Sequence, residues 1–202
     1  CTKLKEIKIK NITSIGMNAF GGCYELTKVD FPNVNTIGTL AFNECRKLET
    51  VLIPNLNNIG SQAFIGCIAL TYVDFSNVNT IGILAFKNCK NLVGSSEGLI
   101  LNNVTSIGKE TFIYCEALSK IIIPNVTNIG ESAFSECISL NSIEFSKELT
   151  NIGASAFYKC SALENVSLPE TVETLGNLAF AYCRFCLPLR RGIHMSRRQF
   201  CL

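Results

Sequence analysis

The chain has few of the residues that enzymes use for acid–base chemistry. Its 202 residues include one histidine, His194. The H-E-x-x-H motif and the phosphate-binding glycine loop are absent. Catalysis needs different reactive groups at one place, and a nucleophilic cysteine needs a base beside it. We therefore expect a protein that is not an enzyme and that needs no cofactor.

Charged residues and long apolar runs are also scarce. Charged side chains make up 17% of the chain and hydrophobic ones 48%, which excludes a disordered protein. No apolar run approaches the roughly 18 residues of a membrane-spanning helix. The length suffices for one domain with a large core. Because the chain begins on Cys1, inside a repeat, we expect it to be a piece of a longer protein with a truncated N-terminus.

The net charge of +2 hides a sharp asymmetry. Residues 1–183 carry twelve Lys, one Arg and all sixteen acidic residues, a net charge of −3, whereas residues 184–202 carry five Arg and no acid. Such a break in composition marks a boundary. We expect one repeat domain over 1–183 and a basic, non-repeat or disordered tail over 184–202.

One phrase recurs along the first 183 residues. Residues 29–45 read VDFPNVNTIGTLAFNEC, and residues 73–89 read VDFSNVNTIGILAFKNC. Each of eight units, most of 22 or 23 residues, ends on a cysteine. The same glycine and phenylalanine recur in every unit: Gly16, Gly38, Gly60, Gly82, Gly108, Gly130, Gly153 and Gly176, and Phe20, Phe42, Phe64, Phe86, Phe112, Phe134, Phe157 and Phe180.

Each unit predicts three structural parts. Residues 26–31 alternate apolar and polar near their end, as a half-buried strand does. The Ile-Gly pair predicts a turn with positive φ at the glycine. The x-x-A-F-x-x-C stretch predicts one short helical turn on the opposite side. A unit this small cannot bury its own apolar residues, so we expect a stack in which every Phe lies on the next.

The repeated I-G-x-x-A-F-x-x-C ending resembles the BspA-like (Treponema pallidum-type) class of leucine-rich repeat over residues 1–183. The resemblance implies an α/β repeat solenoid, a right-handed horseshoe with a parallel β-sheet on one face and short helical turns opposite. It also implies a cell-surface or secreted protein that acts in adhesion or host contact. Val or Ile usually stands where the common repeat has Asn, so a standard asparagine ladder is not expected. The alternative is an intracellular scaffold, which unpaired cysteines favour in a reducing compartment.

The column of cysteines allows three interpretations. Equivalent residues lie about 4.8 Å apart in a stack, which permits disulfides, but an unbroken ladder has no natural pairing. A metal site needs ligands that converge on one point, and a ladder spreads them along a line. We favour the third interpretation, a column of buried thiols that act as small hydrophobes.

The tail adds four zinc-type ligands, Cys183, Cys186, His194 and Cys201. The C-x-x-C half is a recognised ligand spacing, but the gaps that follow match no common zinc module. Cys183 also belongs to the repeat column. We therefore predict no metal site and keep zinc binding by the tail as the weaker alternative.

One column of the predicted sheet faces solvent between the inward positions: Lys8, Asp30, Leu52, Asp74, Ile100, Ile122, Glu144 and Ser167. A second column contains Tyr72. Apolar residues with charged neighbours are typical of an interface, although isolated exposed apolar residues are also common. Our hypothesis is that Leu52, Tyr72, Asp74, Ile100 and Ile122 contact a protein partner.

Two further features border this surface. The fifth unit has 26 residues, with its four extra residues within 93–98. Insertions in solenoids form loops, here either a tolerated loop or one that sets specificity. At the start, four lysines over residues 3–10 fit an edge strand protected from pairing better than a nucleic-acid site, because residues 1–183 are net negative.

Overall fold

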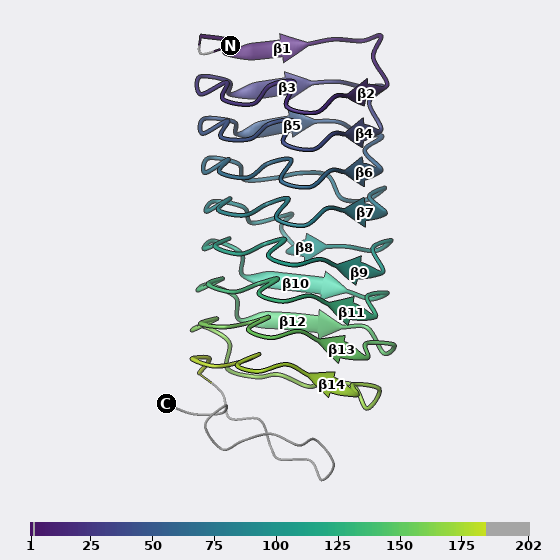
Figure 1. The fold of residues 1–202 in the computed structure, drawn as a ribbon, viewed down its shortest axis with the longest axis vertical. Helices are drawn as coiled ribbons and strands as arrows, with labels where there is room; N and C mark the ends of the chain where they lie inside the picture. Colours follow the sequence, from purple (N-terminus) through teal and green to yellow (C-terminus); the bar gives the residue numbers. More distant parts are fainter. Residues whose placement is uncertain (2, 185–202) are drawn as a thin grey trace.

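The computed structural model describes residue 1 and residues 3–184. The chain winds into an elongated stack of turns, here called rungs and numbered 1 to 8 by the phenylalanines from Phe20 to Phe180 (Figure 1). This confirms the predicted repeat solenoid. In the described range there is no helix of the length and apolar character needed to cross a membrane.

Two rows of short parallel strands run along the stack (Figure 1). The first sheet face consists of β1 (Glu6–Lys8), β3 (Lys28–Asp30), β5 (Thr50–Leu52), β8 (Leu99–Ile100), β10 (Lys120–Ile123) and β12 (Ser142–Phe145). The second consists of β2 (Ser14–Ile15), β4 (Thr36–Ile37), β6 (Asn58–Ile59), β7 (Thr80–Ile81), β9 (Ser106–Ile107), β11 (Asn128–Ile129), β13 (Asn151–Ile152) and β14 (Thr174–Leu175). The resemblance implied one sheet face, so the second is an addition.

Strand pairing follows the repeat. Lys8 pairs with Asp30 and Asp30 with Leu52 on the first sheet face, and Ile100 pairs with Ile122 beyond the insertion. These are successive members of the solvent-facing column, so its predicted register is confirmed over these rungs. Inward residues such as Val29 are fully buried.

The core is built from columns of equivalent side chains. Rung 2 contributes eight residues that are at most 1% exposed: Leu26, Val29, Phe31, Val34, Ile37, Ala41, Phe42 and Cys45. The eight phenylalanines from Phe20 to Phe180 form one continuous row, with neighbouring ring centroids 5.0–5.3 Å apart. We call this row the aromatic spine. Its existence confirms that the units stack in register.

The predicted helical turns are wrong: the described residues contain no helix. In rung 2 the backbone instead takes a positive φ at two residues four positions apart, Leu40 (59°) and Glu44 (58°). A helix needs consecutive residues in the right-handed region. With this backbone path, the N–H groups of Leu40, Phe42 and Glu44 point toward rung 3. They donate to the carbonyls of Ser61, Ala63 and Ile65 at 2.8–3.0 Å.

The physical role predicted for the repeat glycines is also wrong. Positive φ occurs at Gly22, Gly66, Gly94 and Gly98, and not at the eight glycines of the Ile-Gly pairs. Six of those glycines instead allow close backbone approach between rungs: Gly38, Gly60, Gly82, Gly130, Gly153 and Gly176. A Cβ atom at Gly60 would lie 2.6 Å from the carbonyl carbon of Gly38 and 2.6 Å from the Thr39 nitrogen.

A ladder of asparagine side chains connects successive rungs. It lies at a different repeat position from the asparagine ladder of common leucine-rich repeats, so the sequence analysis did not predict it. Each amide nitrogen donates to a carbonyl of the preceding rung, at 2.6–3.1 Å. The donors are Asn33, Asn55, Asn77, Asn103 and Asn125. The ladder ties successive rungs together just beyond the first sheet face, where Asn33, Asn55, Asn103 and Asn125 follow strands β3, β5, β8 and β10.

Candidate functional site

The first sheet face is interrupted between rungs 4 and 5. Its strands form two separate sheets, β1-β3-β5 and β8-β10-β12, and between them Tyr72 makes one isolated bridge to Thr50. The second face is divided at the same level, between β7 and β9. The interruption coincides with the four-residue insertion, which forms a tight turn in which Ser95 and Gly98 exchange backbone hydrogen bonds at 2.9 and 3.0 Å.

The turn removes the hydrogen bonds that would close the sheet. In rung 2, Phe31 N–H donates to Leu52 at 2.9 Å, and in rung 5, Leu101 N–H donates to Ile122 at 3.0 Å. The equivalent donor in rung 4 is Phe75. Within residues 3–184 its N–H has no hydrogen-bond partner, and the same holds for Val73 N–H.

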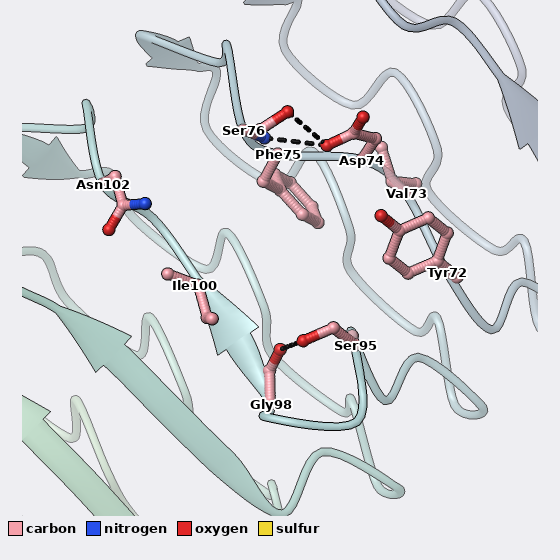
Figure 2. A pocket seen from close by; sticks show the side chains of 10 residues that line it. Tyr72, Val73, Asp74, Phe75, Ser76, Ser95, Gly98, Ile100 and Asn102 are labelled. Atoms are coloured by element: carbon pink, nitrogen blue, oxygen red, sulfur yellow. Dashed lines mark hydrogen bonds between the residues drawn. The ribbon is translucent and has the colours of Figure 1, made fainter.

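A cavity of about 190 Å³ opens between the separated strands. We call it the slot. One wall consists of Tyr72 to Ser76 of rung 4, and the other includes Ile100 and Asn102 of rung 5, with Ser95 and Gly98 at one end (Figure 2). It is therefore a gap in the sheet with an apolar floor and a polar rim.

Asp74 is the charged group of the slot. Its Oδ1 accepts hydrogen bonds from the backbone N–H (2.9 Å) and the hydroxyl (2.6 Å) of Ser76 (Figure 2). Burial and, secondarily, the charge of Asp74 raise the pKa of Tyr72. The carboxylate therefore acts electrostatically on the tyrosine hydroxyl.

The structure places the five predicted contact residues along the middle of the first sheet face. Tyr72, Asp74 and Ile100 line the slot, while Leu52 and Ile122 lie in the neighbouring strands β5 and β10. Leu52 is 43% exposed and Tyr72 is 44% exposed. The sequence thus grouped these residues, but it gave no indication that the sheet opens between them.

The cysteine column consists of thiols that the protein itself satisfies. The described cysteines are free, and those of rungs 1 to 7 are buried. From rung 2 onward each thiol donates to the carbonyl of the spine phenylalanine in the preceding rung, at 3.1–3.3 Å. In the part of the chain that the structure describes, no cluster of three or more metal-ligating residues is found. Cys186, His194 and Cys201 of the weaker zinc alternative lie outside the described residues.

Burial makes these thiols poor nucleophiles. Desolvation raises the pKa of Cys45 from 9.0 to about 12 and raises the pKa of Cys89 well above its ordinary value. Thiolate is the reactive form of cysteine. At neutral pH the column therefore contributes packing and hydrogen bonds and no chemistry.

The raised pKa values predict a loss of stability at alkaline pH. Above pH 9 the thiols ionise in the unfolded chain and stay protonated in the folded one, so the unfolded state binds fewer protons and stability falls as pH rises. Each thiol with a raised pKa adds to the slope, up to about 1.4 kcal/mol per pH unit between its unfolded and folded pKa values. These thiols are Cys45, Cys67, Cys89, Cys115, Cys137 and Cys160. Urea unfolding between pH 8 and 10 measures how the free energy of unfolding changes with pH. In Cys89→Ala this slope should be shallower by the contribution of one thiol.

The matched control is Cys1→Ala, because Cys1 is exposed and meets water in both states. Its slope should equal that of the wild type. Lysine titration is common to all three proteins and cancels from the differences. Equal slopes for Cys89→Ala and the wild type would contradict protonated, buried thiols.

Together these features define a parallel β-solenoid repeat protein whose sheets are interrupted between rungs 4 and 5, with a slot in the first sheet face. The profile of the BspA type leucine rich repeat region matches residues 1–93 and 96–187 in six copies. The chain belongs to this family. Residues 94 and 95, between the two matched stretches, lie in the insertion that opens the slot.

Solved structures agree on the fold. The T. pallidum leucine rich repeat protein is 26% identical, with a TM-score of 0.68, and the alignment covers 83% of this chain and 86% of that one. A leucine-rich repeat protein from Bacteroides ovatus is 23% identical, with a TM-score of 0.64 over 90% of this chain and 59% of its own. A comparison with curated proteins found no match.

Proposed function

We propose that the first sheet face binds a protein partner through Leu52, Tyr72, Asp74, Ile100 and Ile122. Proteins of leucine-rich repeat families typically bind other proteins. The observation that carries the proposal is the grouping of exposed apolar side chains around an opened sheet, since Leu52 and Tyr72 are each more than two-fifths exposed. An apolar centre beside charged neighbours is the anatomy of a protein interface.

Charged residues elsewhere on the molecule pair with one another between rungs. Lys47 pairs with Glu25 at 2.8 Å, Lys109 with Glu131 at 3.1 Å and Lys159 with Glu136 at 2.8 Å. Such pairs offset part of the lysine charge, and residues 1–183 carry a net charge of −3, which does not favour nucleic acid. This supports a protein partner for the first sheet face.

The place of action is proposed to be the cell surface or the secreted fraction, in adhesion or host contact, as the BspA-type resemblance implies. The second candidate is an intracellular scaffold. The free thiols of the described cysteines favour it, because unpaired cysteines persist in reducing compartments. Labelling of intact cells with a membrane-impermeant reagent, followed by detection of this protein, distinguishes the two.

The interface is tested by changing its two sides separately. Tyr72→Ala and Ile122→Asp should each weaken binding to a purified partner at least about tenfold, which corresponds to about 1.4 kcal/mol, because the first removes an exposed and the second a partly exposed apolar side chain from the face. Partners are first isolated from cell-surface extracts on the immobilised wild-type protein, and affinity is then measured by calorimetry.

The matched control is Ile138→Asp, which introduces the same charge at an isoleucine that is 44% exposed and lies outside the strands. Its affinity for the partner should equal that of the wild type. If Tyr72→Ala and Ile122→Asp both bind as the control does, the first sheet face is not the binding surface.

A further inference from the structure

The slot differs from the rest of the first sheet face because it contains main-chain N–H groups that have no partner within residues 3–184. Alternate residues of a parallel strand turn their N–H and C=O toward the same neighbour. The carbonyl of Thr71 accepts from Val93 of rung 5 at 3.0 Å, so Val73 and Phe75 also face rung 5. The acceptor opposite Val73 is occupied, since Gly98 C=O already takes the N–H and the hydroxyl of Ser95, and Phe75 N–H makes no bond to Ile100, which stands where Leu52 stands opposite Phe31.

These groups require a ligand or water. A main-chain donor that is shielded without a partner costs about 1–3 kcal/mol, and nearly all such groups in folded proteins are satisfied. The N–H groups of Val73 and Phe75 have no hydrogen-bond partner among the described residues. A ligand that offers a carbonyl oxygen to either of them would recover the cost of that donor.

The slot cannot widen to accept a complete strand. Both of its ends are closed by hydrogen bonds, Val93 N–H to Thr71 C=O at 3.0 Å and the Asn103 amide to Ser76 C=O at 2.9 Å. Its volume of about 190 Å³ is below the roughly 300–1,000 Å³ of pockets for drug-sized ligands. The space therefore suits one amino-acid residue.

The negative charge of Asp74 determines which type of amino-acid residue the slot would accept. Other carboxylates in the same column have lysine partners: Asp30 pairs with Lys8, and Glu144 with Lys120 at 2.9 Å. Asp74 has no cationic partner within residues 3–184. One of its oxygens is engaged by Ser76, which leaves the other for a donor from outside. The aromatic face of Tyr72 beside it favours a cation as well.

We propose that the slot binds one arginine or lysine residue of an extended partner segment. A main-chain carbonyl of that segment accepts from the N–H of Val73 or of Phe75, and the cationic side chain pairs with Asp74. The aliphatic part of the side chain lies against Ile100. The inference rests on the proposed function, since it specifies which part of a protein partner enters the first sheet face.

The test uses Nα-acetyl-arginine N-methylamide, which contains both a guanidinium group and peptide units. Titration into the ¹⁵N-labelled protein should shift the amide resonances of Val73 and Phe75. The citrulline analogue has the same shape without the charge, and it should bind about tenfold more weakly. Asp74→Asn should abolish this difference, because the amide oxygen still accepts from Ser76 while the negative charge is gone.

The matched control is Asp30→Asn, at an aspartate of the same column that already has Lys8. It should keep the tenfold preference. Absence of shifts at Val73 and Phe75, or equal affinity for arginine and citrulline analogues, overturns the proposal. Stronger shifts of the same amides with a methyl glycoside would assign the slot to carbohydrate and overturn it too.

This outcome is separable from the proposed function. Ile122 does not line the slot, so Ile122→Asp tests the sheet face without the slot. If partner binding depends on Ile122 but the arginine probe fails, the slot proposal alone falls. If the probe binds but Tyr72→Ala and Ile122→Asp both leave partner binding intact, the proposed function falls.

Discussion

Phe86→Ala should lower the free energy of unfolding by about 3–5 kcal/mol, the range for removing a fully buried phenylalanine. Phe86 has no exposed surface. Its ring stacks on Phe64 at 5.2 Å and Phe112 at 5.3 Å and meets Phe75 edge-on at 5.4 Å. Urea unfolding monitored by circular dichroism measures the loss. An unchanged midpoint would contradict a packed aromatic spine.

Phe86 also occupies the level where both sheet faces are interrupted. Rungs 4 and 5 are joined there by the spine and by backbone bonds such as Phe86 N–H to Thr111 at 2.9 Å and Asn88 N–H to Ile113 at 2.9 Å. Stability in solenoids depends on contacts between neighbouring units. In Phe86→Ala we therefore expect the two halves to unfold separately, which appears as a smaller m-value.

The matched control is Phe42→Ala. Phe42 is equally buried and stacks on Phe20 and Phe64 at 5.3 Å each, but both sheet faces are continuous across its rung. It should lose a similar free energy while the m-value stays as in the wild type. Met17→Ala, at a side chain that is 73% exposed, should change stability by less than about 0.5 kcal/mol.

The sequence predicted the features that depend on spacing alone. A fixed interval between equivalent residues determines which side chains lie over one another, so the aromatic spine, the cysteine column and the solvent-facing column containing Leu52 and Ile122 could all be derived. Strand pairs such as Asp30 with Leu52 and Ile100 with Ile122 confirm that register. For the same reason the predicted contact residues came out as neighbours.

The backbone path could not be derived in the same way. Leu40 and Glu44 adopt positive φ, a conformation that costs an ordinary L-residue about 1–2 kcal/mol. Their side chains give no indication of positive φ, because hydrogen bonds to the next rung compensate the energetic cost of that conformation. Tertiary contacts thus decide against the helical turn that the local sequence predicts.

The slot illustrates a second kind of limit. The length of the insertion was visible, and its position beside the predicted surface was too. Whether the extra residues lie outside an intact sheet or break it depends on where Ser95 and Gly98 direct their hydrogen bonds. Once they bond to each other, Val73 and Phe75 lose their partners, and no property of those two residues alone predicts that result.

The repeat glycines lead to the second large effect. Gly60→Ala should destabilise the protein by about 3 kcal/mol, the upper end of the usual range for overpacking. The new methyl group would lie 2.6 Å from backbone atoms of Gly38 and Thr39, and backbone cannot move aside as a flexible side chain can. The rungs must separate locally, which strains the hydrogen bond from Gly60 N–H to Ile37 C=O at 2.7 Å.

Gly16→Ala is the matched control, because the same substitution in the equivalent position of rung 1 meets no atom within 4 Å. Neither glycine has positive φ, so alanine is free of backbone strain at both. Replacing Gly at such a site restricts the unfolded chain and stabilises by about 0.4–1 kcal/mol. Gly16→Ala should therefore raise the unfolding midpoint in urea while Gly60→Ala lowers it. A loss of stability in both variants would mean that the glycines are required for backbone conformation, and equal gains would mean that the rungs are not in close contact.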